Sequence, residues 1–125
     1  MKNNIFLILI FLATACSQPS KTMTVNGSIQ GFQKGTLYLQ RVDDGRFITL
    51  DSLAMNSTTD FELGYDLEEA ELLFLSFSED INAERISFFA DKGVTTINTS
   101  LKRFKYDAQI EGGTQQQLLD TYYKN

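Results

Sequence analysis

The sequence predicts an all-β protein: an antiparallel β-sandwich, or a partly open barrel, of about seven to nine short strands with a short C-terminal α-helix. Three observations support this class. From residue 23 onward apolar and polar residues alternate with a period of two, and turn signals rich in Gly, Asp and Ser separate the alternating runs. A helical period appears only near the end of the 125-residue chain, whose length predicts one domain.

Residues 1–15 have the pattern of a secretory signal peptide. Lys2 precedes eight consecutive large apolar residues (IFLILIFL, residues 5–12), and the small residues Ala13, Thr14 and Ala15 follow. A membrane-spanning helix needs about 20 apolar residues, so this run is too short to be one. We therefore expect residues 1–15 to be removed rather than to form a buried element of the domain.

The chain has a single cysteine, Cys16, directly after this segment. It has no second cysteine with which to form an intramolecular disulfide, and the chain has no histidine to activate the thiol. The stretch ATAC (residues 13–16) resembles the lipobox of bacterial lipoproteins, although Ala13 stands where leucine is commoner. The resemblance implies that Cys16 is acylated and becomes the first mature residue. The alternatives are that Cys16 pairs with a cysteine of another molecule or remains a free thiol. Several acyl chains anchor a protein stably, at about 0.8 kcal/mol per buried CH₂. Residues 16–22 then form the lipidated N-terminus and a polar tether.

The predicted sandwich occupies residues 23–112, and its first strand covers residues 23–30. Gly27 and Gly31 fall on the inward face of this strand, where they indicate a bulge or a close neighbour. Residues 36–42 place Leu37 and Leu39 on one face of a second strand. The sequence DDG (residues 43–45) then predicts a tight hairpin into residues 46–51, because an Asp-Gly pair between β-forming residues is a strong hairpin signal.

The middle of the chain contains three further predicted strands. After residues 52–56 and a polar turn at residues 57–59, residues 60–65 alternate regularly. Residues 72–77 (LLFLSF) are apolar on both faces, which predicts a central strand covered on two sides. In residues 86–90, Phe88 and Phe89 point to opposite faces, so one of these aromatic rings, like Tyr38 and Phe74, is a candidate for an outward-facing surface.

The last predicted strands are residues 94–98, after the turn DKG (residues 91–93), and residues 108–111. Residues 113–125 then change to a helical period, with Thr114 and Gln117 matching a capping box. This amphipathic C-terminal helix is a candidate partner surface, and we expect it to pack on the sheet edge or to contact another protein. Its apolar face consists of Leu118, Leu119, Tyr122 and Tyr123.

Charge excludes some classes of partner. Without residues 1–15 the chain carries 10 Lys and Arg against 16 Asp and Glu, a net charge of −6, and these charges are scattered. Phosphate binding requires clustered basic residues, so we expect no nucleic-acid partner. Docking on anionic lipid through a polybasic patch is disfavoured for the same reason.

The sequence predicts neither a catalytic nor a metal site. Zinc and iron sites use His or Cys, and no calcium-binding loop is present, so we expect no metal and no cofactor. The hairpin turn accounts for Asp43 and Asp44. Paired carboxylates can cleave glycosides, but the acidic groups of this chain fall at predicted turns, so we expect no enzyme. These groups are Glu68, Glu69 and Glu71, and Glu79 and Asp80.

A family resemblance spans nearly the whole predicted domain. It rests on the order of VNGSI (residues 25–29), GTLYL (35–39), LDS (50–52), DFEL (60–63), ADKGV (90–94) and IEGGT (110–114). This order resembles the uncharacterised β-sandwich domain found N-terminal to thioredoxin-like domains in Gram-negative envelope lipoproteins. That family implies no established activity or catalytic residue. In longer relatives a redox domain with a Cys-x-x-Cys pair follows, whereas this sequence ends at Asn125, so we expect no redox chemistry.

These observations favour a lipid-anchored domain of the cell envelope that binds or scaffolds and does not catalyse. Two alternatives remain open: an accessory domain that positions a separate thioredoxin-like protein, and a carrier of a small ligand within a barrel. The membrane would be contacted through the lipid on Cys16. No acidic run follows Cys16, so we expect the domain to face the periplasm, by analogy with the export signals of surface lipoproteins.

Overall fold

Eight strands and their connections make up residues 21–112, the part of the chain that the computed structural model describes. Cys16 and the predicted C-terminal helix lie outside these residues. The strands are β1 (Met23–Gln30), β2 (Lys34–Asp43), β3 (Arg46–Asn56), β4 (Asp60–Tyr65), β5 (Glu71–Ser76), β6 (Ile86–Ala90), β7 (Gly93–Ser100) and β8 (Gln109–Glu111).

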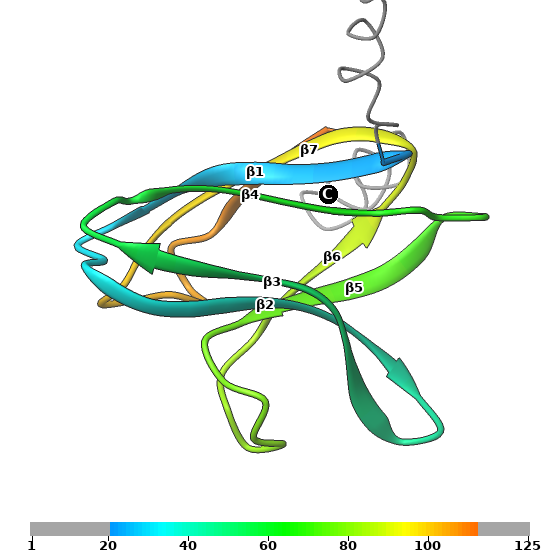
Figure 1. The fold of residues 1–125 in the computed structure, drawn as a ribbon, viewed down its shortest axis with the longest axis horizontal. Helices are drawn as coiled ribbons and strands as arrows, with labels where there is room; N and C mark the ends of the chain where they lie inside the picture. Colours follow the sequence, from blue (N-terminus) through cyan, green and yellow to red (C-terminus); the bar gives the residue numbers. More distant parts are fainter. Residues whose placement is uncertain (1–20, 113–125) are drawn as a thin grey trace, which may run out of the picture.

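The strands form two four-stranded sheets packed as layers, which agrees with the predicted all-β class (Figure 1). One sheet has the order β4-β1-β7-β8 and the other the order β3-β2-β5-β6. The prediction of a purely antiparallel fold is wrong at one place, because β1 and β7 pair in parallel. All the strands of the second sheet lie between β1 and β7 in the sequence. Local turn signals do not specify the direction of such a non-local pair.

The core lies between the sheets and is built from alternate residues of each strand. In β1, Met23, Val25 and Ile29 are fully buried, while in β2 the same holds for Leu37 and Leu39. Burial of these side chains supplies the main stabilisation of a small domain, at about 25 cal/mol per Å² of apolar surface. The predicted inward faces of these two strands are confirmed.

The β2–β3 hairpin confirms the turn predicted from DDG. Asp43 pairs with Arg46 across a two-residue loop in which Asp44 (φ 55°) and Gly45 (φ 76°) both have positive φ. Two positive φ angles are typical of the hairpin turn whose twist matches that of the strands. Beyond the turn β3 continues as one strand to Asn56, with a bulge opposite Leu39 and Gln40.

Gly27 marks a close approach of two strands, as predicted. A Cβ atom at Gly27 would overlap the backbone carbonyl oxygen of Ile97, its partner in the parallel β1–β7 ladder. The prediction for Gly31 is wrong: it lies in the exposed turn after β1 rather than on the inward face. The prediction extended the alternating pattern one residue beyond Gln30, where β1 ends, because periodicity alone does not show where a strand ends.

Strand β5 is central in its sheet, between β2 and β6, but it is not covered on both faces. Leu73 and Leu75 are fully buried, whereas Leu72 is 43% exposed. The prediction of two covered faces is therefore wrong at Leu72, because no element of the described chain packs over that end of the outer face. Phe88 is buried and Phe89 half-buried, on opposite faces as predicted.

The two sheets are bridged along one side, where β3 and β4 form neighbouring edges. The backbone N–H of Gly64 in β4 donates to Asp51 Oδ2 in β3 at 2.9 Å. The connection between these strands is also fixed, because Ile29 N donates to the Thr59 carbonyl at 2.8 Å. The Asp51 carboxylate thus satisfies an edge amide that would otherwise offer itself to another strand.

Candidate functional site

A shallow polar groove lies on the outer face of the sheet β4-β1-β7-β8. Its floor follows the strand register: Ser28 of β1, Asn98 of β7 and Gln109 of β8 form one row. Gln30 and Ser100 form the next row toward the end of the sheet. The groove has a volume of about 490 Å³ and is lined by amide and hydroxyl side chains together with Tyr106 and Asp107.

Tyr106 forms the rim of the groove, and its residue is 73% exposed. Anchors on both sides fix the backbone that carries it. On one side Phe104 is buried against Phe77, at 4.5 Å between ring centroids, and its carbonyl accepts the Thr99 hydroxyl at 2.7 Å. On the other side Asp107 Oδ2 accepts the Ser100 hydroxyl at 2.7 Å. The exposed ring therefore stands on a fixed segment rather than on a loose loop.

The Asn98 amide is oriented by its neighbour on β1. Its Oδ1 accepts both the Ser28 backbone N–H, at 3.0 Å, and the Ser28 hydroxyl, at 3.2 Å. Because the oxygen faces β1, the NH₂ group is left as a donor. Among the described residues that NH₂ group has no acceptor, so the groove floor presents a preoriented hydrogen-bond donor.

The groove lies at the end of the sandwich remote from the N-terminal junction, the point at which Thr22 leads into β1. Strand β1 runs from Met23, next to the junction, to Gln30 in the groove, which is roughly 25 Å for eight residues. Gly112 lies at the Met23 end, because a Cβ there would overlap the Val94 carbonyl and Val94 pairs with Thr24. Both ends of the described chain are thus near the junction (Figure 1). The groove residues Ser28 and Gln30 lie at the opposite end of β1.

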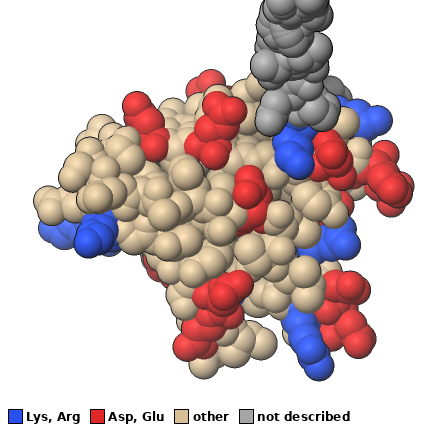
Figure 2. Space-filling view, in the orientation of Figure 1, with Lys and Arg blue, Asp and Glu red and all other residues tan. Residues whose placement is uncertain are grey.

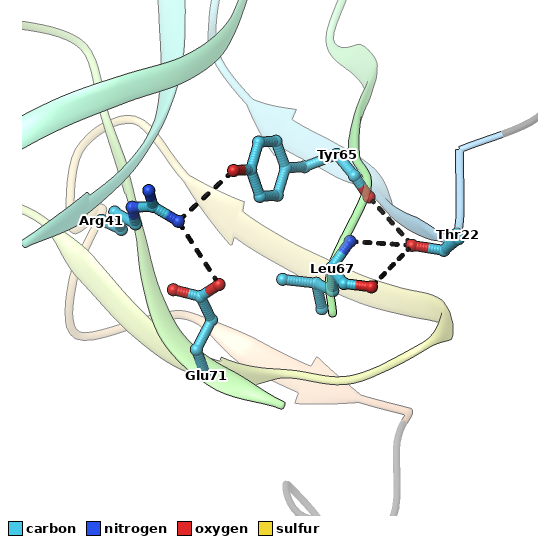
Figure 3. Close-up of polar contacts among 5 residues, drawn as sticks. All are labelled: Thr22, Arg41, Tyr65, Leu67 and Glu71. Atoms are coloured by element: carbon cyan, nitrogen blue, oxygen red, sulfur yellow. Dashed lines mark hydrogen bonds and ion pairs between the residues drawn. The ribbon is translucent and has the colours of Figure 1, made fainter. Parts of the chain in front are cut away.

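At the junction, Thr22 fastens the chain to the β4–β5 connection. Its hydroxyl accepts the Leu67 N–H at 2.8 Å (Figure 3). Its N–H donates to Asp66 Oδ1 at 3.0 Å. The Thr22 carbonyl accepts the Gly93 N–H at 2.9 Å. The chain is therefore held at Thr22 by both the β4–β5 connection and the turn between β6 and β7.

Beside this junction Arg41 lies between Tyr65 and Glu71 (Figure 3). Arg41 donates to the Tyr65 hydroxyl at 3.3 Å and forms an ion pair of 3.7 Å with Glu71. Both charged side chains are about one-third exposed (34% and 30%), so the ion pair contributes little, about 0–1 kcal/mol. The hollow they line has a volume of about 370 Å³, and Asp66, Glu68 and Glu69 complete its wall.

Of the acidic residues considered in the sequence, all but Glu71 lie in connections between strands, as predicted; the prediction is wrong for Glu71. Glu68 and Glu69 lie in the β4–β5 connection, and Glu71 begins β5. Glu79 and Asp80 lie in the connection after β5, where Glu79 accepts the Thr49 hydroxyl at 2.7 Å. Within residues 21–112 no three such side chains are grouped as a metal site would require. Charges of both signs are interspersed on the face in Figure 2.

A buried cation holds the β5–β6 connection against the outer face of its own sheet, β3-β2-β5-β6. Arg85 is 9% exposed, its Nε donates to Gln40 Oε1 at 2.9 Å, and its guanidinium lies 3.6 Å from the centre of the Phe47 ring. It also donates to the Ala83 carbonyl at 3.0 Å. Burial lowers the pKa of Arg85, and the charge of Asp80 partly opposes this shift. These contacts are internal to the domain, so we assign the cluster a structural role.

The sequence-predicted site residues and the groove do not coincide. Cys16 and the four residues Leu118, Leu119, Tyr122 and Tyr123 lie outside the described residues. The groove residues Asn98 and Tyr106 were not singled out from the sequence, because polar residues on an outward face look alike in every strand. The sequence signal that could have indicated the groove was Tyr106, an aromatic residue in the polar stretch KRFKYDAQ (residues 102–109).

The fold and the groove together define a small all-β domain of two packed sheets with a polar, open hollow at one end. The chain belongs to the family described as Domain of unknown function (DUF4369), whose family model matches residues 23–119. This agrees with the resemblance to an uncharacterised domain. No curated protein and no solved structure matches the chain.

No helix within residues 21–112 has the length and apolar character needed to span a bilayer.

Proposed function

We propose that this chain is a lipid-anchored, periplasm-facing domain of the cell envelope that binds a partner through the polar groove and does not catalyse a reaction. One observation carries the proposal. The groove, with its exposed Tyr106 and preoriented Asn98 amide, lies at the end opposite to Thr22, where the proposed tether joins the domain. A domain held at Thr22 presents that groove away from the membrane.

The anchoring part of the proposal is supported by the ATAC stretch and by the fixed junction. A tether transmits position to a domain only if its point of attachment is rigid, and hydrogen bonds with Asp66, Leu67 and Gly93 hold Thr22. We expect cells fed an alkyne analogue of palmitate to label the wild-type chain and not the Cys16→Ser variant. Equal labelling of the two chains would contradict acylation at Cys16.

The binding part is tested by placing a photoreactive residue in the groove. With p-benzoylphenylalanine at position 109, irradiation of cells should yield an adduct with an envelope component. The matched control carries it at position 87, an exposed position on β6 of the other sheet. Adducts at position 109 alone support the groove as the binding site, whereas none at 109, or equal yields at both positions, would contradict it.

A second candidate is an accessory domain for a thioredoxin-like protein. The resemblance to domains that precede thioredoxin-like domains supports it, and the family match, which continues past Gly112 to residue 119, includes part of the C-terminal segment. In this case residues 114–125, with Leu118, Leu119, Tyr122 and Tyr123, contact the partner. Capture of a Cys-x-x-Cys protein by the full chain, lost on deletion of residues 114–125, would support this function. Equal capture after deletion would remove the segment from the account.

A small-ligand carrier, the third alternative, receives no support from the described residues. The buried apolar side chains of both sheets face one another as a packed core. The hollows described above open at the surface of the sandwich. We therefore do not pursue this alternative.

A further inference from the structure

We infer that the groove binds an uncharged saccharide, an inference that rests on the proposed binding function and names its ligand class. The geometry that points to it is the combination of a row of amide and hydroxyl groups with one exposed aromatic ring at its rim. Each of these two features fits a different part of a sugar: its hydroxyl groups and its apolar C–H face.

The groove floor matches the hydrogen-bonding needs of sugar hydroxyls. Each hydroxyl both donates and accepts, so a site for several adjacent hydroxyls must offer donors and acceptors side by side. Asn98 supplies an oriented NH₂ donor, because its oxygen is held by Ser28. Gln109, next in the row, and Gln30, in the following row, are exposed amides that offer both donor and acceptor atoms.

Tyr106 supplies the apolar surface. A pyranose ring presents polarised C–H groups on its faces, and these pack on the negative face of an aromatic ring. The residue is 73% exposed, and its backbone is fixed between buried Phe104 and the Ser100–Asp107 hydrogen bond. Lys105 Nζ lies over the ring at 6.0 Å from its centre, at the outer limit of a cation–π contact, and its flexible stem can move aside for a ligand.

Other ligand classes fit less well. Apolar small molecules bind in enclosed pockets lined by apolar groups, whereas this groove is open and polar. Nucleic acids and phosphorylated sugars carry anions, whereas the charged side chain among the residues that line the groove is the Asp107 carboxylate, which already pairs with Arg103 at 3.4 Å. A peptide added as a β-strand needs a free sheet edge, while the groove lies on the face of the sheet.

The test uses the full chain purified in detergent, with chitotriose, cellotriose and maltotriose as probes. Saturation-transfer NMR titrations would give a dissociation constant for each trisaccharide. Glucose 6-phosphate serves as the anionic probe, and a neutral nine-residue peptide as the peptide probe. We expect at least one trisaccharide to bind in the millimolar range or tighter, with neither of the other two probes competing.

Variants at two positions of the groove, Tyr106 and Asn98, locate the binding. Tyr106→Ala should weaken binding by about tenfold or more, as truncation of an aromatic anchor does, while Tyr106→Phe should keep it within about twofold. Asn98→Asp retains the oxygen that accepts from Ser28 and removes the NH₂ donor, so it should weaken binding about tenfold through the lost donor. Ile81→Ala, 63% exposed on the β5–β6 connection, is the remote control.

The outcomes separate the inference from the proposed function. Trisaccharide binding that Tyr106→Ala and Asn98→Asp weaken supports both. Absence of trisaccharide binding, or binding unchanged in both variants, overturns the saccharide inference. If crosslinking at position 109 still occurs in that case, or if Tyr106→Ala abolishes binding of the peptide, the groove remains a binding site for another class of ligand. If crosslinking is also absent, the proposed function fails too. Thermal unfolding of each variant shows whether it is folded.

Discussion

The buried Arg85–Gln40 pair allows a sharp test of how this domain holds its β5–β6 connection. Gln40 is fully buried on the outer side of β2, where its Oε1 accepts Arg85 Nε at 2.9 Å and its Nε2 donates to the Thr49 hydroxyl at 3.2 Å. Removal of one partner of a buried charged hydrogen bond leaves the other unsatisfied, whereas removal of both does not. The sum of the stability losses caused by the two single substitutions should therefore exceed the loss caused by the double substitution.

The magnitudes follow from the contacts. Gln40→Leu leaves the guanidinium without its shortest acceptor and removes the bond to Thr49, which together should lower the free energy of unfolding by about 3 kcal/mol. Arg85→Met leaves Gln40 Oε1 unsatisfied and removes the carbonyl contacts and the interaction with Phe47, for about 4 kcal/mol. In the double variant the bond between the two side chains is lost once and neither side chain is left as an unsatisfied partner, so we expect about 4 to 5 kcal/mol rather than 7.

Urea unfolding followed by circular dichroism measures these free energies. Gln40→Glu is the matched control, because it keeps an acceptor for Arg85 Nε, and it should stay within about 1 kcal/mol of wild type. Ile81→Ala, exposed on the same connection, should change stability by about 0.5 kcal/mol at most. If the two single effects add to within about 0.5 kcal/mol, the coupling between Arg85 and Gln40 is absent and the reasoning is refuted.

Three further predictions test the described fold by unfolding measurements. Leu73→Ala should cost about 2–5 kcal/mol because Leu73 is fully buried, whereas the neighbouring Leu72→Ala should cost under about 1 kcal/mol; equal losses would mean that the faces of β5 are wrongly assigned. Gly27→Ala should lower stability by about 3 kcal/mol, since its Cβ would overlap the Ile97 carbonyl and only backbone movement relieves it; a wild-type melting temperature would contradict the parallel β1–β7 approach. Thr22→Val should cost about 1–2 kcal/mol through the lost acceptor of the Leu67 N–H, and Thr24→Val, with no such bond, should be within about 0.5 kcal/mol; an equal effect of both would remove the special role of the junction.

The elements that could be predicted from the sequence are those with a local cause. Asp44 and Gly45 adopt the hairpin turn because these residue types tolerate positive φ. The alternation in β4 buries Phe61 and Leu63 and exposes Glu62, because side chains on a strand point to opposite faces. In each case the residues that determine the structure lie within a few positions of one another.

The candidate site could not be predicted in this way. The row of groove residues consists of Ser28, Asn98 and Gln109. Ser28 and Asn98 are 70 residues apart in the sequence, and only the register of the parallel β1–β7 ladder aligns them. Likewise, Gln40 looks like an outward polar residue in its strand, yet it is fully buried because the β5–β6 connection folds over it. Periodicity gives the face on which a side chain lies, but not what covers that face.

The sequence by itself thus determined the all-β class, most strand positions, the hairpin and the inward residues of β1 and β2, because alternation and turn chemistry act locally. It also led to the family resemblance. Only the tertiary structure decided the parallel pairing of β1 with β7, the exposure of Leu72, the burial of Arg85 and the assembly of the groove beside Tyr106. Each of these depends on which distant segments meet, and that choice is made by the packing of the whole core rather than by any stretch of the chain.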